Sequence, residues 1–191
     1  MIVMAPGDAN DIGAMLDFSM SQDKACAIRY PKLAAAEIDR ELLPIELGKS
    51  ETLREGRDGV IVCAGTPLVD CLAAAEKLAE EGIDVGVVNA RFVKPIDTDM
   101  VRDTIENHGF VVTVEEAMLK GGFGSAFLEA ANELRVDATK VHRIGIPDVF
   151  VEHGDRAGLL ADLRLDTAGI ATTCRELYAS SGTVSSEKTI S

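Results

Sequence analysis

Residues 112–130 read VTVEEAMLKGGFGSAFLEA and predict a β-strand, a glycine-rich turn and a helix in succession. Residues 110–114 have the apolar, β-branched composition of a strand, and Phe127, Ala131 and Leu134 recur on one face of the helix that follows. Strands that alternate with helices in this way are typical of a parallel sheet with right-handed crossovers. The stretch therefore decides the fold class, which is α/β.

The same alternation extends to both sides of this stretch. The strands that we expect to be parallel are residues 60–64, 83–88, 110–114 and 141–146. We expect a fifth strand within residues 45–55, antiparallel and at the edge, paired with residues 60–64 through the turn at 56–59. The expected caps of the helices that follow are Thr66, Asp97, Asp155 and Asp166.

The N-terminal residues predict a smaller βαβ unit. Residues 1–6 have the pattern of a strand, and Asp8 caps a helix in which Ile12, Leu16 and Met20 recur every four residues. Residues 25–30 predict a second strand, which ends at a proline. This unit is too small to fold alone, so we divide the chain into residues 1–43, residues 44–179 and a tail, 180–191, that we expect to be disordered because it lacks apolar periodicity.

Composition excludes several functional classes. The chain has 19 basic and 32 acidic residues and a formal charge of −13, so it repels nucleic acid and anionic membrane surfaces. We find no apolar run of membrane-spanning length and no signal-peptide pattern. Cys26, Cys63, Cys71 and Cys174 form no C-x-x-C pair, and we expect reduced core thiols in a cytoplasmic protein.

The glycines at 121–124 permit two interpretations. Gly122 and Gly124 match the start of a dinucleotide fingerprint, but Phe127 stands at the third glycine position, and the Gly-Lys-Ser/Thr of a P-loop is missing. Glu115 and Glu116 oppose a bound anion, whereas the free N–H groups of the helix N-terminus favour one. A phosphate site and a packing junction between loop and helix both remain open.

The histidines give a weaker signal. His108 falls in the last turn of a predicted helix, and His142 begins a strand. His153 lies in a loop beside two carboxylates, where a loop hydrogen bond and acid–base chemistry are the alternatives. The spacing of the three histidines in the sequence does not by itself predict a catalytic site that contains any of them.

The segment Arg29-Tyr-Pro-Lys32 follows a predicted strand. The carboxyl ends of strands are where α/β proteins place ligands, and two cations within four residues suit a phosphate or carboxylate. A solvated basic pair is the competing interpretation.

Six segments, in order, carry a family resemblance: MAPGDANDIGAML, AIRYPK, RFVKPIDTDMV, VTVEEAMLKGGFGSAF, IGIPDVFVEHG and LRLDTAGI. Together they resemble the C-terminal third of the 1-deoxy-D-xylulose-5-phosphate synthase family, thiamine-diphosphate enzymes of the transketolase-like superfamily. The resemblance implies a transketolase C-terminal-domain-like three-layer sandwich. Its sheet has about five strands, mixed but mostly parallel, with helices on both faces. A βαβ remnant of the pyrimidine-binding domain precedes it.

The resemblance also implies a function. Members of this family condense pyruvate with glyceraldehyde 3-phosphate, with decarboxylation, using thiamine diphosphate and Mg²⁺, and act as cytoplasmic homodimers in isoprenoid and thiamine biosynthesis. The family's Arg-Tyr-Pro-Arg-Gly segment corresponds to residues 29–33 here, which makes Lys32, with Arg29 beside it, the expected contact to the substrate phosphate. Lys32 keeps the charge but not the bidentate fork of arginine, and Leu33 replaces the glycine of the turn.

No catalytic, cofactor-binding or metal-binding residue of the family falls within this chain. We therefore expect a C-terminal fragment that is inactive alone and binds no cofactor. An alternative is the C-terminal domain of a transketolase or of a 2-oxoacid dehydrogenase E1 β subunit, which serves as a subunit-interaction module.

Overall fold

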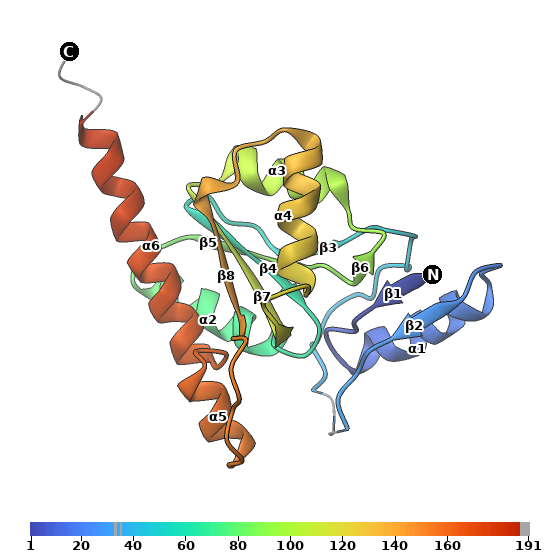
Figure 1. Cartoon of the computed structure of the whole chain (residues 1–191). Coiled ribbons are helices and arrows are strands. Elements are labelled where there is room, and N and C mark those ends of the chain that lie inside the picture. Colours follow the sequence, from blue (N-terminus) through green and yellow to red (C-terminus); the bar gives the residue numbers. More distant parts are fainter. Residues whose placement is uncertain (33, 35, 188–191) are drawn as a thin grey trace.

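The computed structural model describes residues 1–32, 34 and 36–187, and its strands form two sheets (Figure 1). The strands are β1 (Ile2–Met4), β2 (Cys26–Ile28), β3 (Glu51–Arg54), β4 (Gly59–Ala64), β5 (Val85–Asn89), β6 (Phe92–Lys94), β7 (Phe110–Met118) and β8 (Val141–Ile146). The helices are α1 (Ala9–Met20), α2 (Leu68–Glu80), α3 (Thr98–Asn107), α4 (Phe123–Leu134), the 3-10 turn η1 (Ala138–Lys140), α5 (Arg156–Asp162) and α6 (Thr167–Glu187).

The large sheet has the order β3-β5-β4-β7-β8. Strand β4 pairs in parallel with β5 and β7, and β7 pairs in parallel with β8. Strand β3 is antiparallel to β5 and lies at the edge. The prediction of four parallel strands with an antiparallel edge strand is confirmed.

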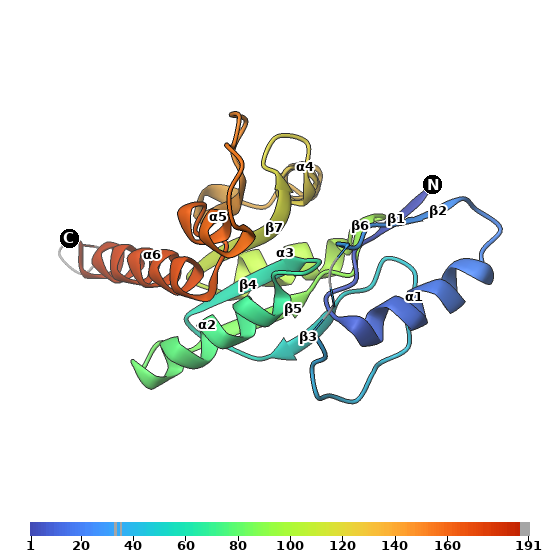
Figure 2. The ribbon, with the colours of Figure 1, turned by 90° about the horizontal axis from the view of Figure 1, so that it is seen from below.

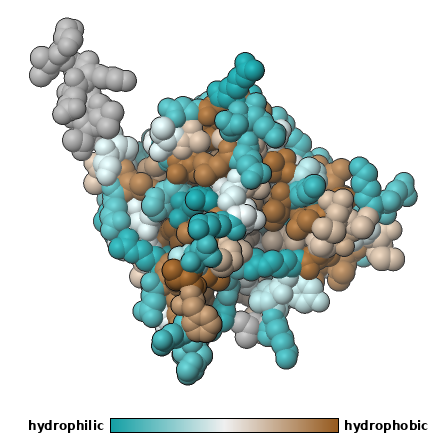
Figure 3. Space-filling model, viewed as in Figure 1, coloured by the Kyte–Doolittle hydropathy of each residue, from teal (hydrophilic) through white to brown (hydrophobic). Residues whose placement is uncertain are grey.

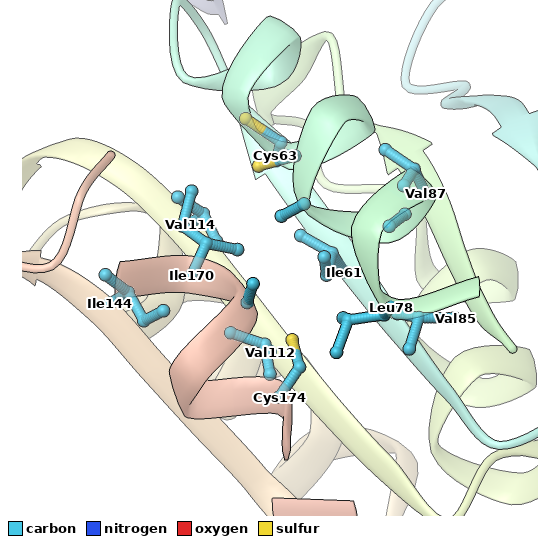
Figure 4. Close-up of a cluster of buried hydrophobic side chains, with 14 of the residues drawn as sticks. Ile61, Cys63, Leu78, Val85, Val87, Val112, Val114, Ile144, Ile170 and Cys174 are labelled. Atoms are coloured by element: carbon cyan, nitrogen blue, oxygen red, sulfur yellow. The ribbon is translucent and has the colours of Figure 1, made fainter. Parts of the chain in front are cut away.

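Helices cover both faces of this sheet, as expected for a three-layer sandwich. On one face Ile61 and Val112 of the sheet pack with side chains of α2 and α6, among them Leu78 and Ile170 (Figure 4). On the other face α3 and α4 contribute a second cluster, which includes Phe127. Alternate residues of β4 enter the two clusters, because successive side chains of a strand point to opposite faces.

The predicted pairing of residues 45–55 with 60–64 is wrong. All six residues of β4 are buried, and both edges of this strand are taken by parallel neighbours. The chain after β3 therefore crosses the start of β5, where the N–H groups of Arg57 and Asp58 donate to the carbonyl of Asp84. A glycine-containing turn between two strands predicts that the two strands pair side by side. The turn here does reverse the chain between β3 and β4, but β5 lies between these two strands in the sheet.

Four of the five predicted helix caps are confirmed. The carboxylates of Asp8, Asp97, Asp155 and Asp166 accept backbone N–H groups in the first turns of their helices. Thr66 is the exception, since α2 begins at Leu68 with Pro67 at the N-cap and no side-chain cap.

The small sheet confirms the N-terminal βαβ unit and adds one strand. Strands β1 and β2 are parallel and connected through α1, while β6, which follows β5 in the chain, pairs antiparallel with β1. Met15 of α1 is buried in a cluster with Phe92 of β6, and Phe18 meets Phe92 edge to face with ring centroids 5.8 Å apart. The sequence analysis did not predict β6.

A buried group of charged and amide side chains, which we call the acid–arginine cluster, connects the small sheet to the large one. Its members are Asp8, Asp11, Arg40, Glu51, Asn89 and Arg91. Arg40 Nη2 lies 3.1 Å from Asp11 and 3.2 Å from Glu51, and Arg40 also pairs with Asp8. Arg91 Nη2 lies 2.8 Å from Glu51 and 3.3 Å from Asp11, and Asn89 donates to Asp11 at 2.7 Å.

The cluster holds three carboxylates against two guanidinium groups, so it keeps an excess negative charge away from water. Burial acts to raise the pKa of Asp8, but hydrogen bonds from Arg40 and from the backbone N–H groups of Asp11 and Ile38 hold that pKa below its ordinary value. Removing one partner of such a network leaves a buried charge uncompensated, which costs about 3–5 kcal/mol.

The C-terminal end differs from the predicted disordered tail. Helix α6 continues to Glu187 with no break at Ser180, while residues 188–191 lie outside the described part of the chain. Extending a helix that is already nucleated and packed costs little per residue, so apolar periodicity is not required over these turns. Among the helices that the structure describes, none combines the length and apolar character needed to cross a bilayer.

Candidate functional site

The glycine cluster forms the N-terminus of α4, and a carboxylate of the chain itself fills the place of an anion there. Glu115, buried in β7, accepts the N–H of Phe123 at 2.6 Å and the N–H of Gly124 at 2.8 Å. A Cβ at Gly122 would lie 2.2 Å from Glu115 Oε2, so the glycine allows the carboxylate to approach. The N–H groups that a phosphate would use are taken, and the packing interpretation explains the glycines.

The loop before α4 is held by further hydrogen bonds. Ser125 Oγ accepts the N–H of Gly121 at 3.0 Å and donates to the carbonyl of Leu119 at 2.8 Å. Arg143 of β8 donates to the same carbonyl at 2.9 Å. Gly121 has a φ of +76°, a conformation that glycine adopts without strain. The turn is therefore a fixed structural element.

The segment that follows β2 crosses toward the large sheet. The N–H of Arg29 donates to the carbonyl of Met4, and the Arg29 guanidinium donates to the carbonyl of Glu116 in β7. Lys32 is exposed, and Leu33 lies outside the described residues. The carboxyl end of β2 is thus held beside the carboxyl end of β7.

A crevice runs between this segment and the large sheet. It consists of a cavity of about 230 Å³ and an adjoining one of about 160 Å³. Both are lined by Tyr30, Pro31, Thr66 and Glu116. Arg29 lines the smaller cavity, whereas Lys32 lines neither. Of the two predicted contact residues, the structure brings only Arg29 to the crevice.

The crevice also contains polar groups that the sequence analysis did not select. Arg156, the first residue of α5, lies 2.5 Å from the Glu116 carboxylate. Asp70 accepts the hydroxyl of Thr167 at 2.6 Å. The sequence signal that could have found this crevice is the position of Thr66 and Glu116. They lie at the carboxyl ends of the neighbouring parallel strands β4 and β7, where open α/β sheets bind ligands.

The histidines stay apart from the crevice. His108 Nδ1 lies 3.1 Å from the carbonyl of Thr104, one turn earlier in α3, and the side chains of His142 in β8 and His153 in the loop before α5 are exposed. Within the described residues, no three His, Cys, Asp or Glu side chains are placed to hold a metal ion.

The cysteines are free, and three are core residues. Cys63, Cys71 and Cys174 are buried, while Cys26 is half-buried. Burial raises the pKa of the Cys71 thiol well above its ordinary value and that of Cys174 to about 12. The thiols of Cys71 and Cys174 are therefore protonated at neutral pH and are weak nucleophiles.

Substitution of Glu115 by Gln tests the bound-carboxylate interpretation of the glycine cluster. We expect Glu115→Gln to lower the free energy of unfolding by about 1.5–3 kcal/mol, because two charge-assisted hydrogen bonds are weakened in a buried site. Urea denaturation followed by circular dichroism measures it. Glu116→Gln is the matched control and should change stability by less than about 1 kcal/mol, since that carboxylate is in a partly exposed ion pair. Equal effects of the two substitutions would contradict the interpretation.

Comparisons with protein families and with known sequences agree with one another. The family described as "Transketolase, C-terminal domain" matches residues 48–170. A protein of Rhodopirellula baltica named 1-deoxy-D-xylulose-5-phosphate synthase is 50% identical over 182 residues, which cover 95% of this chain and 28% of that protein. A protein of Geobacter sulfurreducens named 1-deoxy-D-xylulose-5-phosphate synthase 1 is 44% identical over 95% of this chain and 29% of its own length. The chain thus spans little more than a quarter of these relatives.

Solved structures agree on the fold. A structure described as a split-gene transketolase, an inactive β4 tetramer, aligns with a TM-score of 0.85 at 29% identity, covering 94% of this chain and 58% of that one. The transketolase of Campylobacter jejuni aligns with a TM-score of 0.64 at 16% identity over 92% of this chain and 26% of its own, which supports the fold alone. The chain belongs to the transketolase C-terminal domain family, and it matches the C-terminal part of proteins named 1-deoxy-D-xylulose-5-phosphate synthase.

Proposed function

We propose that this chain is the C-terminal part of a 1-deoxy-D-xylulose-5-phosphate synthase. The observation that carries the proposal is the extent of the match to the Rhodopirellula baltica protein. The matched family domain covers residues 48–170, whereas the 50% identity runs over 95% of the chain and so includes most of the residues that precede this domain. In this proposal residues 1–43 end the pyrimidine-binding domain and residues 44–179 are the C-terminal domain.

The reaction of the whole enzyme would join pyruvate, after loss of carbon dioxide, to glyceraldehyde 3-phosphate, as a step toward isoprenoids and thiamine. Thiamine diphosphate with Mg²⁺ would supply the chemistry that forms the new carbon–carbon bond. Glu115 already accepts the N–H groups at the glycine cluster, so that turn offers no site for the diphosphate. The preceding part of the enzyme would hold the cofactor.

This chain would contribute to the binding of the substrate phosphate. Lys32 is exposed, and Arg29 keeps N–H groups beyond the one that donates to Glu116. The nearby carboxylate of Glu116 is neutralised by Arg156, so it does not repel a phosphate strongly. A lysine ammonium acts as a point charge toward phosphate and binds without the geometric specificity of arginine.

Assembly and location complete the proposal. We infer a homodimer for the whole enzyme and a cytoplasmic location, with no nucleic acid or membrane partner, in keeping with the charge of −13. The second candidate function is a subunit-interaction module. It is favoured by the related structure at 29% identity, which is described as an inactive tetramer of β chains.

An activity assay tests the proposal directly. With pyruvate, glyceraldehyde 3-phosphate, thiamine diphosphate and Mg²⁺, the chain alone should give no product. The same chain fused behind the preceding part of the Rhodopirellula baltica protein should form 1-deoxy-D-xylulose 5-phosphate. Product from the isolated chain would overturn the prediction that it lacks the catalytic groups, and a folded fusion without activity would overturn the assignment.

Lys32→Ala in the fused enzyme tests the phosphate contact. We expect kcat/KM for glyceraldehyde 3-phosphate to fall by the equivalent of about 1.5–3 kcal/mol, the contribution of a hydrogen bond to a charged group. Lys24→Ala, which removes an exposed lysine before β2, is the control and should leave kcat/KM unchanged. Unchanged kinetics in Lys32→Ala would exclude this role.

A further inference from the structure

Strand β7 is irregular where it reaches the crevice. Between residues 114 and 118 it advances four positions, while the paired part of β8 advances two, from 144 to 146. Within the described residues, the strand registers pair neither Glu116 nor Ala117 with a residue of β4 or β8, and we call these two residues the β7 bulge. Gly145 of β8 leaves room for the bulge, because a Cβ there would lie only 3.0 Å from the carbonyl oxygen of Ala117. Bulges re-aim local groups and are frequent beside active sites.

Glu116 of the β7 bulge makes two contacts, to two different parts of the chain. Its carbonyl accepts a hydrogen bond from the Arg29 guanidinium, and its carboxylate lies 2.5 Å from Arg156 Nη2. In Figures 1 and 2, β7 lies between α5, which begins with Arg156, and the unit formed by β1, α1 and β2. Figure 3 shows teal and pale surface between the hydrophobic surfaces of these two parts. The bulge therefore connects α5 to residues 29–32, which we call the basic segment.

The two ends of this connection are held to different degrees. Arg156 belongs to a helix that Asp155 caps, and Leu160 of the same helix packs against the core of the large sheet. The basic segment is exposed at Arg29 and Lys32. Within the described part of the chain, the Arg29 side chain donates to Glu116 alone and Lys32 has no polar partner. The position of the basic segment thus depends on the orientation of residue 116.

The Glu116–Arg156 ion pair supplies that orientation. Strand pairing does not fix residue 116, so its side-chain contact decides where its carbonyl points. A partly exposed ion pair contributes little to global stability, so we expect its effect on local geometry. We propose that Glu116 and Arg156 are positioning residues, which hold Arg29, and with it the basic segment, in place for the substrate phosphate. This inference rests on the proposed function for the identity of the substrate.

Kinetics of the fusion behind the preceding part of the Rhodopirellula baltica protein test the inference. We expect Arg156→Met to lower kcat/KM for glyceraldehyde 3-phosphate about 10-fold through a higher KM, because a displacement of about 1 Å can cost about 100-fold. The KM for pyruvate should stay within about twofold, since pyruvate carries no phosphate. Arg156→Lys should retain most of kcat/KM, because it keeps a cation beside Glu116.

Arg175→Met is the matched control. The Arg175 side chain is 44% exposed, against 45% for Arg156, and pairs with Glu81 rather than with a residue of the crevice. This variant should leave kcat/KM unchanged. Equal losses in Arg156→Met and Arg175→Met would overturn the proposal.

A double variant separates positioning from direct contact. If Arg156 acts through Arg29, Arg29→Met and the double variant with Arg156→Met should lower kcat/KM by the same factor. A direct contact of Arg156 with the phosphate would make the two losses multiply, to about 100-fold for two losses of about 10-fold. That result would overturn the positioning role.

Amide hydrogen exchange, measured by NMR on the isolated chain, gives a readout without activity. The N–H of Arg29 donates to the carbonyl of Met4, so its exchange reports opening of the basic segment. We expect Arg156→Met to speed this exchange about 5- to 10-fold and Arg175→Met to leave it unchanged. The N–H of Ile2, which donates to Ala25 at the other end of the same strand pair, should exchange at an unchanged rate.

The two readouts distinguish the possible failures. Unchanged exchange at Arg29 in Arg156→Met would overturn the positioning role, and so would faster exchange with unchanged kcat/KM in an active fusion. Faster exchange at Arg29 in a chain whose fusion is inactive would count against the proposed function and leave this inference about the basic segment standing.

Discussion

The arrangement of the two sheets depends on the acid–arginine cluster. Asp8 and Asp11 come from the start of α1, Arg40 from the connecting segment, and Glu51, Asn89 and Arg91 from the edge of the large sheet. Charges removed from water are tolerated only when paired and hydrogen-bonded, so each part of the cluster requires the others. Arg40 alone contacts three carboxylates from both sides of the junction. The cluster therefore fixes where the small sheet lies relative to the large one.

The crevice is a consequence of this arrangement. Once the small sheet is in place, the segment after β2 passes over the carboxyl ends of β4 and β7, and Arg29 reaches the carbonyl of Glu116. The two glutamates of β7 have different roles, because neighbouring side chains along a strand point to opposite faces of the sheet. Glu115 turns inward to the N-terminus of α4, and Glu116 turns toward Arg156 at the crevice. Glu115 thus stabilises the fold, and Glu116 contributes to the candidate site.

Much of the fold could be predicted because its signals are local. The apolar runs of β4 and β7 and the aspartate caps of α1 and α3 depend on residues near one another in sequence, and the structure confirms them. Strand pairing and side-chain partners depend on residues far apart in sequence. The sequence showed Asp8 as a cap but not as a partner of Arg40, 32 residues away.

The candidate site was predicted only in part, for the same reason. The family resemblance selected Arg29 and Lys32, but the contact of Arg29 with Glu116 spans 87 residues, and Arg156 was not selected at all. The period of Ile12, Leu16 and Met20 predicted a helix here, which the structure confirms, but Leu16 and Met20 are exposed and Met15 is the apolar residue that α1 buries. The glycine cluster had two interpretations, and the position of the Glu115 carboxylate decides between them.

A double-mutant cycle across the junction tests the central role of the acid–arginine cluster. Asp11→Asn alters the small-sheet side, Arg91→Met alters the large-sheet side, and urea denaturation gives the free energy of unfolding of each variant and of the pair. Because the two side chains lie 3.3 Å apart in a buried network, we expect a coupling energy above about 1 kcal/mol. Additive effects within about 0.3 kcal/mol would contradict the claim that these charges hold the two sheets together.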